Sequence, residues 1–192
     1  MTAKKALVLI GYSGSGKDTL TRMAQARFVG VGNCKFGEFN KLVAALALGV
    51  APSCFEDKHW RVTENILHTQ FGMDNDYHLS PLDLLSVLFV GGTSNTPVGE
   101  HWRHCYQSYT IAKAKTFDTP VFTDIRHPSE LAKVRGEFDA CVVKLQTFHL
   151  APAANDTYIE ELRCDKVITR HQSTPATSTF EELLTITNTY WR

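Results

Sequence analysis

The sequence predicts an α/β fold in which a mainly parallel sheet of about five strands lies between two layers of helices. The apolar run Ala6–Ile10 is short and continuous, as in a strand that is buried on both faces. A glycine-rich turn and a helical pattern from about 17 to 28 follow it directly. Strand and helix patterns then alternate along the chain, which is typical of a parallel sheet covered by helices.

The sequence pattern predicts the positions of the strands and helices along the chain. Strands are expected at 6–10, 31–36, 121–123, 140–145 and 167–168. Helices are expected at about 17–28, 42–48, 81–92, 100–115, 128–134, 158–162 and from 179 onward, with an amphipathic segment at 56–71. Ser80-Pro81 predicts a helix start because a capping residue precedes a proline at the first helical position. Thr179 and Glu182 have the spacing of a capping box, which predicts that the last helix begins there.

Length and composition suit one domain over residues 1–192. Of these 192 residues 43% are apolar and 21% are charged, as in ordinary globular proteins. The 20 basic and 20 acidic residues cancel, which argues against a general nucleic-acid-binding protein. No apolar stretch is long enough for a membrane span, and five scattered cysteines without a CxxC pair indicate reduced thiols in a cytoplasmic protein. Residues from about 40 to 116 are expected to form a helical insertion over one end of the sheet.

The most specific motif is GYSGSGKDT, Gly11 to Thr19, between the first strand and the first helix. This is the context that a phosphate-binding loop requires, and it makes the expected fold one of the P-loop NTPase type. Glycines allow backbone N–H groups to surround a phosphate, the helix N-terminus attracts negative charge, and Lys17 reaches the β- and γ-phosphates. The residues expected to bind ATP are Ser13, Gly14, Ser15, Gly16, Lys17, Asp18 and Thr19.

Asp18 departs from the usual loop, in which Ser or Thr follows the lysine. Thr19 is therefore expected to hold a phosphate oxygen or Mg²⁺, directly or through water. Asp18 is expected either to orient the magnesium shell or to accept a proton from the attacking group.

A second motif, DIRHPSE, begins with Asp124 at the end of a later strand. Open α/β sheets bind ligands at the carboxyl ends of their strands. Asp124 is therefore expected to support Mg²⁺, directly or through water, and Arg126 is expected to clamp a phosphate with two hydrogen bonds. The alternative is a plain helix start with a solvent-exposed ion pair between Arg126 and Glu130.

Together the two motifs resemble phage-type deoxynucleoside monophosphate kinases, which are P-loop enzymes that transfer the γ-phosphate of ATP to a deoxynucleoside monophosphate. Residues 15–19, SGKDT, match the family's loop. Asp124, Arg126 and Glu130 match its Asp-x-Arg-x-x-x-Glu element. Weaker matches lie between the motifs, at 36–42, 84–93 and 99–102.

Two departures from the family concern its arginines. Leu82 and Asp83 stand where several members carry an arginine. Residues 146–162 contain none of the arginines that the lid usually contributes, and only Arg163, Lys166 and Arg170 follow. The positive charges around the transferred phosphoryl group are therefore expected to come from other residues.

The resemblance implies ATP as the donor, Mg²⁺ as the cofactor, small-molecule nucleotides as the partners and a lid-like region at about 146–164. It leaves a homodimer open, and it implies the host cytoplasm as the location if the chain is phage-encoded. Lys17, Asp18 and Arg126 are the expected catalytic residues. The expected metal-binding residues are Asp18, Thr19 and Asp124. The expected acceptor-binding residues are Lys41, Glu100, Trp102, Arg103, Asp124, Arg126 and Glu130.

Two alternative functions stay open at this point. One is a P-loop kinase for another phosphorylated acceptor, such as dephospho-coenzyme A, which would use Lys17 and Arg126 but a different pocket in residues 36–116. The other is a nucleotide-dependent switch without transfer activity, although the chain has no Asn-Lys-x-Asp guanine motif. The Ser- and Thr-rich segment 172–179 is either a loop on the adenine side of the donor or a plain exposed loop.

Overall fold

The computed structural model describes residues 3–66, 69, 72, 78–93, 96–152 and 158–191. The chain forms two compact units, one of residues 1–35 together with 110–192 and one of residues 36–109. The second unit covers most of the segment that the sequence predicts as a helical insertion.

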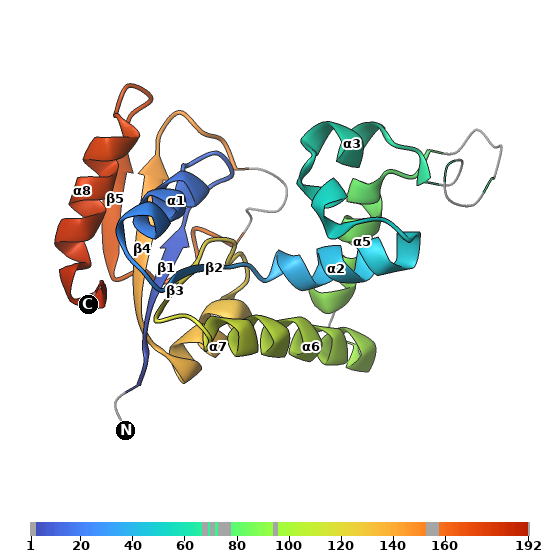
Figure 1. The fold of residues 1–192 in the computed structure, drawn as a ribbon, viewed down its shortest axis with the longest axis horizontal. Helices are drawn as coiled ribbons and strands as arrows, with labels where there is room; N and C mark the ends of the chain where they lie inside the picture. Colours follow the sequence, from blue (N-terminus) through green and yellow to red (C-terminus); the bar gives the residue numbers. More distant parts are fainter. Residues whose placement is uncertain are drawn as a thin grey trace. The chain divides into compact units, whose positions relative to one another are not determined.

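A five-stranded parallel sheet forms the centre of the described part of the first unit (Figure 1). Its strands are β1 (Lys5–Ile10), β2 (Val31–Cys34), β3 (Thr119–Phe122), β4 (Asp139–Thr147) and β5 (Lys166–Arg170). They lie in the order β2-β3-β1-β4-β5, and every pair of neighbours is parallel. The predicted α/β fold with about five parallel strands is therefore confirmed.

The central position of β1 explains its continuous apolar sequence. Leu7 lies opposite Val121 of β3 on one side and Cys141 of β4 on the other. The five residues from Ala6 to Ile10 are buried, because helices cover both faces of the strand.

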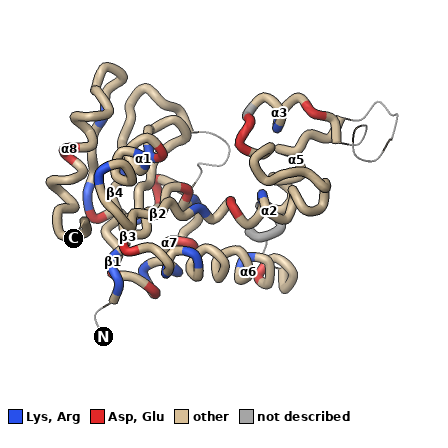
Figure 2. Tube along the Cα trace, in the orientation of Figure 1, with Lys and Arg blue, Asp and Glu red and all other residues tan. Residues whose placement is uncertain are grey.

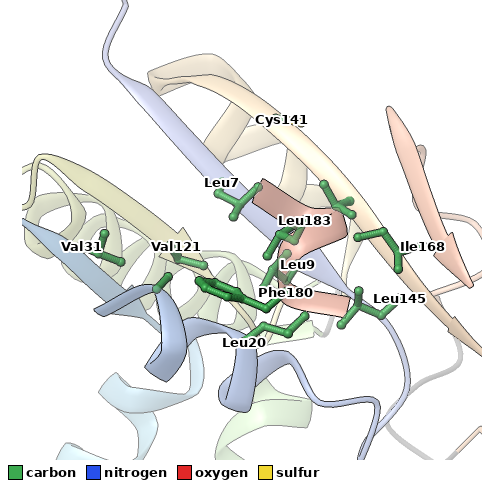
Figure 3. Packing of buried hydrophobic residues seen from close by; sticks show 12 residues of the cluster. Leu7, Leu9, Leu20, Val31, Val121, Cys141, Leu145, Ile168, Phe180 and Leu183 are labelled. Carbon is green, nitrogen blue, oxygen red and sulfur yellow. The ribbon is translucent and has the colours of Figure 1, made fainter. Parts of the chain in front are cut away.

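Helices pack on both faces of this sheet. On one face, α1 (Lys17–Arg27) and α8 (Ala176–Ile186) place Leu20, Phe180 and Leu183 against Leu9 and its neighbours (Figure 3). The side chains of a strand alternate between its two faces, so Phe122 points to the face opposite that of Val121. There its ring lies 5.8 Å from that of Phe138, at the end of α7 (Pro128–Glu137). The predicted three layers are thus present.

Two predicted elements of the first unit are wrong. Residues 158–162 form a turn instead of a helix. The last helix begins at Ala176 instead of at Thr179, because Pro175 has the extended backbone that precedes a helix. Thr179 is buried inside the helix, and its hydroxyl donates to the carbonyl oxygen of Pro175 (3.3 Å). The capping-box spacing of Thr179 and Glu182 is therefore coincidental. A short 3₁₀ helix, η3 (Asn188–Tyr190), follows α8.

The described part of the second unit is helical. Its elements are α2 (Gly37–Leu48), η1 (Pro52–Glu56), α3 (Lys58–Thr63), α5 (Pro81–Thr93) and α6 (Pro97–Ala114), the last of which continues into the first unit. Its core contains Leu48, Phe55 and Ile66. The predicted start of α5 is confirmed, because Asp83 N–H donates to Ser80 Oγ (3.2 Å) and the Asp83 carboxylate accepts from Ser80 N–H (2.9 Å). Residues 67, 68, 70 and 71 of the predicted amphipathic segment lie outside the described residues.

Charge is mixed along both units. Figure 2 shows basic and acidic residues interspersed along the chain, with no long stretch of one sign. Among the described helices, none combines the length and the apolar character that crossing a lipid bilayer requires.

Candidate active site

The loop between β1 and α1 has a backbone that its glycines make possible. Gly11, Gly14 and Gly16 have φ values of 149°, 84° and 95°, in the region that side chains disfavour. A Cβ at Gly11 would lie 2.7 Å from the carbonyl oxygen of Leu145, and one at Gly16 would lie 2.4 Å from Nη1 of Arg170. Backbone packing therefore adds to the backbone geometry in excluding a side chain at Gly11, whereas a Cβ at Gly16 would have to displace the guanidinium of Arg170.

Several N–H groups of this loop are available to a ligand. In the part of the chain that the structure describes, the N–H groups of Gly14, Gly16, Asp18 and Thr19 donate to no backbone carbonyl. The first turn of any helix leaves such groups unbonded, and their partial positive charges attract an anion. The loop thus has the donors that a phosphate group needs, as the sequence predicts.

The Lys17 side chain lies over the loop. Its ammonium group donates to the carbonyl oxygens of Gly11 (2.6 Å) and Tyr12 (2.8 Å) and to Ser15 Oγ (3.3 Å). The lysine ammonium group thus lies beside the available N–H groups.

Asp18 is held in a polar network at the carboxyl ends of β2 and β3. Its Oδ1 atom lies 2.8 Å from Lys35 Nζ and accepts a hydrogen bond from Thr123 (3.4 Å), whose hydroxyl also lies within 3.1 Å of Asn33 Oδ1. Partial burial opposes ionisation, but the hydrogen bond and charge of Lys35, with hydrogen bonds from Asn33 and Thr123, outweigh it and hold the pKa of Asp18 below its ordinary value. Asp18 is therefore an anion and a weak base at neutral pH.

The DIRHPSE segment places Arg126 just before α7 through a buried carboxylate. Glu130 is fully buried, and its Oε2 atom accepts the backbone N–H groups of Arg126 (2.9 Å) and His127 (3.1 Å). The ring of His127 accepts Ser129 N–H in return (3.2 Å), which completes a capping box. The alternative interpretation, a solvent-exposed ion pair between Arg126 and Glu130, is therefore wrong. Whether Glu130 also contacts an acceptor stays a prediction.

The guanidinium group of Arg126 is available to a ligand. It takes part in no hydrogen bond or ion pair with the described residues, and it is about half-buried. Its backbone is fixed by the capping box, at the same edge of the sheet as the phosphate loop. An arginine in this position suits an anionic group brought by a substrate.

The residues predicted to bind Mg²⁺ provide oxygen ligands. Asp18 is ionised, and Thr19 Oγ1 lies 3.5 Å from Nη2 of Arg22, a weak contact that an ion or its water can replace. In the described ranges, no group of three or more His, Cys, Asp or Glu side chains is placed to hold a metal ion by itself. Mg²⁺ in phosphate-transfer sites is bound through substrate phosphates, water and one or two carboxylates. The oxygen atoms of Asp18, Thr19 and Asp124 are of the kind that this ion binds, and their role as its ligands stays a prediction.

A cavity of about 210 Å³ lies at the carboxyl ends of β1 and β4. The residues that line it include Gly11, Tyr12, Lys144, Thr147 and Glu160. Tyr12 donates to Glu160 (2.7 Å), which is also paired with Lys144. These contacts tie the phosphate loop to the turn at 158–162. Residues 153–157 of the predicted lid-like region lie outside the described residues.

The predicted acceptor residues of the second unit lie on α2 and α6. Trp102 Nε1 donates to Asn40 Oδ1 (3.1 Å), and the ring of Phe39 lies 5.4 Å from that of Trp102 and 5.5 Å from that of Tyr109. Lys41 is paired with Glu56 (2.6 Å), while Glu100 is exposed and Arg103 is half-buried. The structure thus places Trp102 in an aromatic cluster with Phe39 and Tyr109, and it gives Lys41 an ion-pair partner.

Sequence reasoning missed four residues of the site, namely Asn33, Lys35, Thr123 and Arg170. Each of them lies within one residue of the last residue of a strand. Because parallel strands bring these ends to one edge of a sheet, that position was the available signal. Arg170, the last residue of β5, donates to the carbonyl oxygens of Ser15 (2.8 Å) and Thr174 (3.3 Å).

Comparison with known proteins gives matches to solved structures alone. No protein-family model and no curated protein sequence matches this chain. One similar structure is a shikimate kinase from Aquifex aeolicus vf5 (11% identity, 96% of each chain, TM-score 0.46). Two others are TT1252 from Thermus thermophilus (13% identity, 98% of each chain, TM-score 0.44) and an APS kinase from Mycobacterium tuberculosis (12% identity, 98% of this chain and 99% of that chain, TM-score 0.42). Identities of 11–13% and TM-scores of 0.42–0.46 are too low to carry an argument about the activity of this chain.

Proposed function

We propose that this chain is a P-loop kinase that transfers the γ-phosphate of ATP to the phosphate of a deoxynucleoside monophosphate. The observation that carries the proposal is the loop from Gly11 to Thr19, with its available N–H groups and the ammonium of Lys17, at the carboxyl edge of a parallel sheet. Such a loop binds the phosphates of a nucleotide donor through backbone donors and one lysine.

The kind of acceptor is suggested by the side chains beside the loop. A hydroxyl acceptor needs a general base, but Asp18, whose pKa is lowered, is a weak one. A phosphate acceptor already carries a nucleophilic anionic oxygen, and it needs positive charges that bring two anions together. Arg126, whose guanidinium forms no hydrogen bond or ion pair with the described residues, suits that second task.

The nucleoside part of the proposal has separate support. The two sequence motifs resemble those of phage-type deoxynucleoside monophosphate kinases, and the second unit contains the aromatic cluster Phe39, Trp102 and Tyr109. Aromatic rings stack on nucleobases whatever the base. Glu100 and Arg103 lie on the same helix as Trp102, and we propose that they contribute polar contacts to the acceptor.

In the proposed reaction the protein mainly positions the two phosphates. Lys17 and the loop N–H groups hold the donor, and Arg126 holds the acceptor phosphate in line with it. A bound Mg²⁺ would neutralise charge on the phosphate oxygens, and Asp18, Thr19 and Asp124 would support that ion or its waters. As the acceptor oxygen attacks, the bond between the γ-phosphorus and the bridging oxygen breaks, and ADP leaves with the electron pair.

A chromatographic transfer assay tests this proposal. The protein is incubated with ATP, Mg²⁺ and a panel of deoxy- and ribonucleoside monophosphates, and diphosphate products are quantified. We expect a deoxynucleoside diphosphate, and a loss of turnover on the order of 100-fold in Lys17→Ala. The matched control is Lys115→Ala, which removes an exposed ammonium group of the same unit.

The other outcomes are equally informative. Transfer to a different phosphorylated acceptor, with Lys17 still required, would favour the broader kinase and reject the nucleotide acceptor. ATP binding without transfer to any acceptor would favour a nucleotide-dependent switch. Near-normal turnover of Lys17→Ala would reject the assignment of the loop.

A further inference from the structure

We propose that Arg170 is a positioning residue that orients the Ser15–Gly16 peptide of the loop and so presents the Gly16 N–H group to a phosphate. This inference rests on the proposed function of the loop as a phosphate site. It concerns a residue 154 positions from Gly16 in the sequence, at the end of the strand β5.

The guanidinium group of Arg170 is bound to the loop at close range. Its Nη1 atom donates to the carbonyl oxygen of Ser15 at 2.8 Å. Its Nη2 atom donates to the carbonyl oxygen of Thr174 (3.3 Å). The same turn contains a hydrogen bond from His171 N–H to the hydroxyl oxygen of Thr174 (3.1 Å). The guanidinium is thus held between the phosphate loop and the segment that follows β5.

Gly16 allows this close approach. A Cβ at this position would lie 2.4 Å from Nη1 of Arg170, nearer than any van der Waals contact permits. Gly16 and Arg170 are therefore fitted to each other, and a side chain at Gly16 would displace the guanidinium from the loop.

Because the peptide bond is planar, the contact with the Ser15 carbonyl also fixes the direction of the Gly16 N–H group. In the described chain no peptide bond is cis, so the Ser15 carbonyl and the Gly16 N–H point in opposite directions. With the carbonyl held by Arg170, the Gly16 N–H points away from Arg170. This N–H donates to no backbone carbonyl within the described residues, so it is available to an anion.

The first turn of α1 leaves a second donor available. Gly16 is the N-cap of α1, and its carbonyl accepts the first helical bond, from Leu20 N–H (3.0 Å). The Ser15 carbonyl lies before the cap, so Arg170 binds it without taking an acceptor from the helix. Thr19 N–H donates to no backbone carbonyl among the described residues, so it is available beside that of Gly16.

The charge of Arg170 points to an anionic ligand. Among the described residues it forms no ion pair with a carboxylate, and its Nε atom is buried without a hydrogen-bond acceptor. A half-buried guanidinium bound to carbonyl oxygens alone keeps its full positive charge. A phosphate on the loop would supply the negative charge that the protein does not.

Inorganic pyrophosphate is a suitable probe because it reports on the loop without a nucleoside. Its affinity is measured by calorimetry for the wild-type protein, Arg170→Gln, Arg170→Lys and the control Arg27→Gln, each first shown to be folded by circular dichroism. Arg27 lies at the far end of α1, and its side chain is 53% exposed. Arg27→Gln therefore removes the same positive charge as Arg170→Gln, but away from the loop. We expect binding at least tenfold weaker in Arg170→Gln, an intermediate loss in Arg170→Lys and a change below twofold in Arg27→Gln.

A double-mutant cycle separates positioning from general support of the fold. If Arg170 acts through the Ser15–Gly16 peptide, Arg170→Gln should weaken pyrophosphate binding little further once Gly16→Ala is present. Independent, additive losses would overturn the inference, and Arg170→Lys, which keeps the charge without the two-pronged guanidinium, tests it if Arg170→Gln does not fold.

The failure of this inference is distinguishable from that of the proposed function. Unchanged pyrophosphate affinity in Arg170→Gln, with a wild-type protein that transfers phosphate, would reject the role of Arg170 alone. A wild-type protein that neither binds pyrophosphate nor transfers phosphate would reject both.

Discussion

Replacing Glu130 should affect stability and catalysis by different amounts, depending on the substituent. Its fully buried carboxylate accepts two backbone N–H groups, those of Arg126 (2.9 Å) and His127 (3.1 Å). Glu130→Ala removes both bonds, whereas Glu130→Gln keeps an oxygen that can accept them without the negative charge. The two variants therefore separate the hydrogen bonds from the charge.

The magnitude follows from these two bonds. A hydrogen bond to a charged group contributes about 1.5 kcal/mol at the lower end of its range, so Glu130→Ala should reduce the free energy of unfolding by about 3 kcal/mol. Glu130→Gln should cost about 1 kcal/mol, as for the loss of charge assistance. In a chain of this length, 1 kcal/mol lowers Tm by roughly 2–4 °C, which puts Glu130→Ala about 6–12 °C below the wild-type protein.

Denaturant titration and steady-state kinetics together test this reasoning. Because Glu130 fixes the backbone of Arg126, Glu130→Ala should also lower kcat, while ATP binding stays unchanged. The control Glu181→Gln removes a carboxylate that is 65% exposed, and it should change stability by less than about 0.5 kcal/mol. A Glu130→Ala variant with wild-type stability would refute the argument. A Glu130→Gln variant of wild-type stability that loses acceptor binding would show instead that Glu130 contacts the acceptor.

Two further predictions concern charges near the loop. Arg126→Ala should abolish transfer or acceptor binding and spare ATP binding, which separate titrations of ATP and of the acceptor measure. A loss of ATP binding with normal acceptor binding would show that the assignment is wrong. Lys35→Met should raise the pKa of Asp18, because burial then acts without the opposing charge, and an NMR titration of the carboxyl carbon measures it. In the wild-type protein this pKa lies below 3.8, so the stability that ionised Asp18 contributes is present above that pH and is lost as the pH falls through the folded-state pKa.

The fold was predictable where local chemistry and tertiary packing agree. The apolar run of β1, the glycines after it and Ser80-Pro81 each indicate an element that the structure contains. The start of α8 was not predictable, because Thr179 has the residue type of a helix cap but is buried within the helix. Tertiary burial decided that boundary, and the sequence pattern does not contain it. The cap of α7 was missed for another reason: His127 fills a role more usual for Ser, Thr, Asn or Asp.

The candidate site divides in a similar way. The loop around Lys17 was predictable because its donors are contiguous in the sequence. The contact of Arg170 with Ser15 and that of Lys35 with Asp18 were not predictable. Each joins the loop or helix that follows β1 to the end of another strand, and only the strand order brings these segments to one edge of the sheet. The position of Glu130 in the second motif was recognised, but its burial was not, and burial decides what it does.

The strand order also affects how the chain folds as it leaves the ribosome. β1 and β2 emerge first, yet they are not neighbours in the sheet, since β3 lies between them. Both neighbours of β1, which are β3 and β4, follow the second unit and begin only at Thr119 and Asp139. The contiguous segment 36–109 can therefore complete its contacts while the apolar β1 still has no strand to pair with. Nascent chains that stop before Thr119 should expose β1 to chaperones or to aggregation, and release of β3 and β4 should end that exposure.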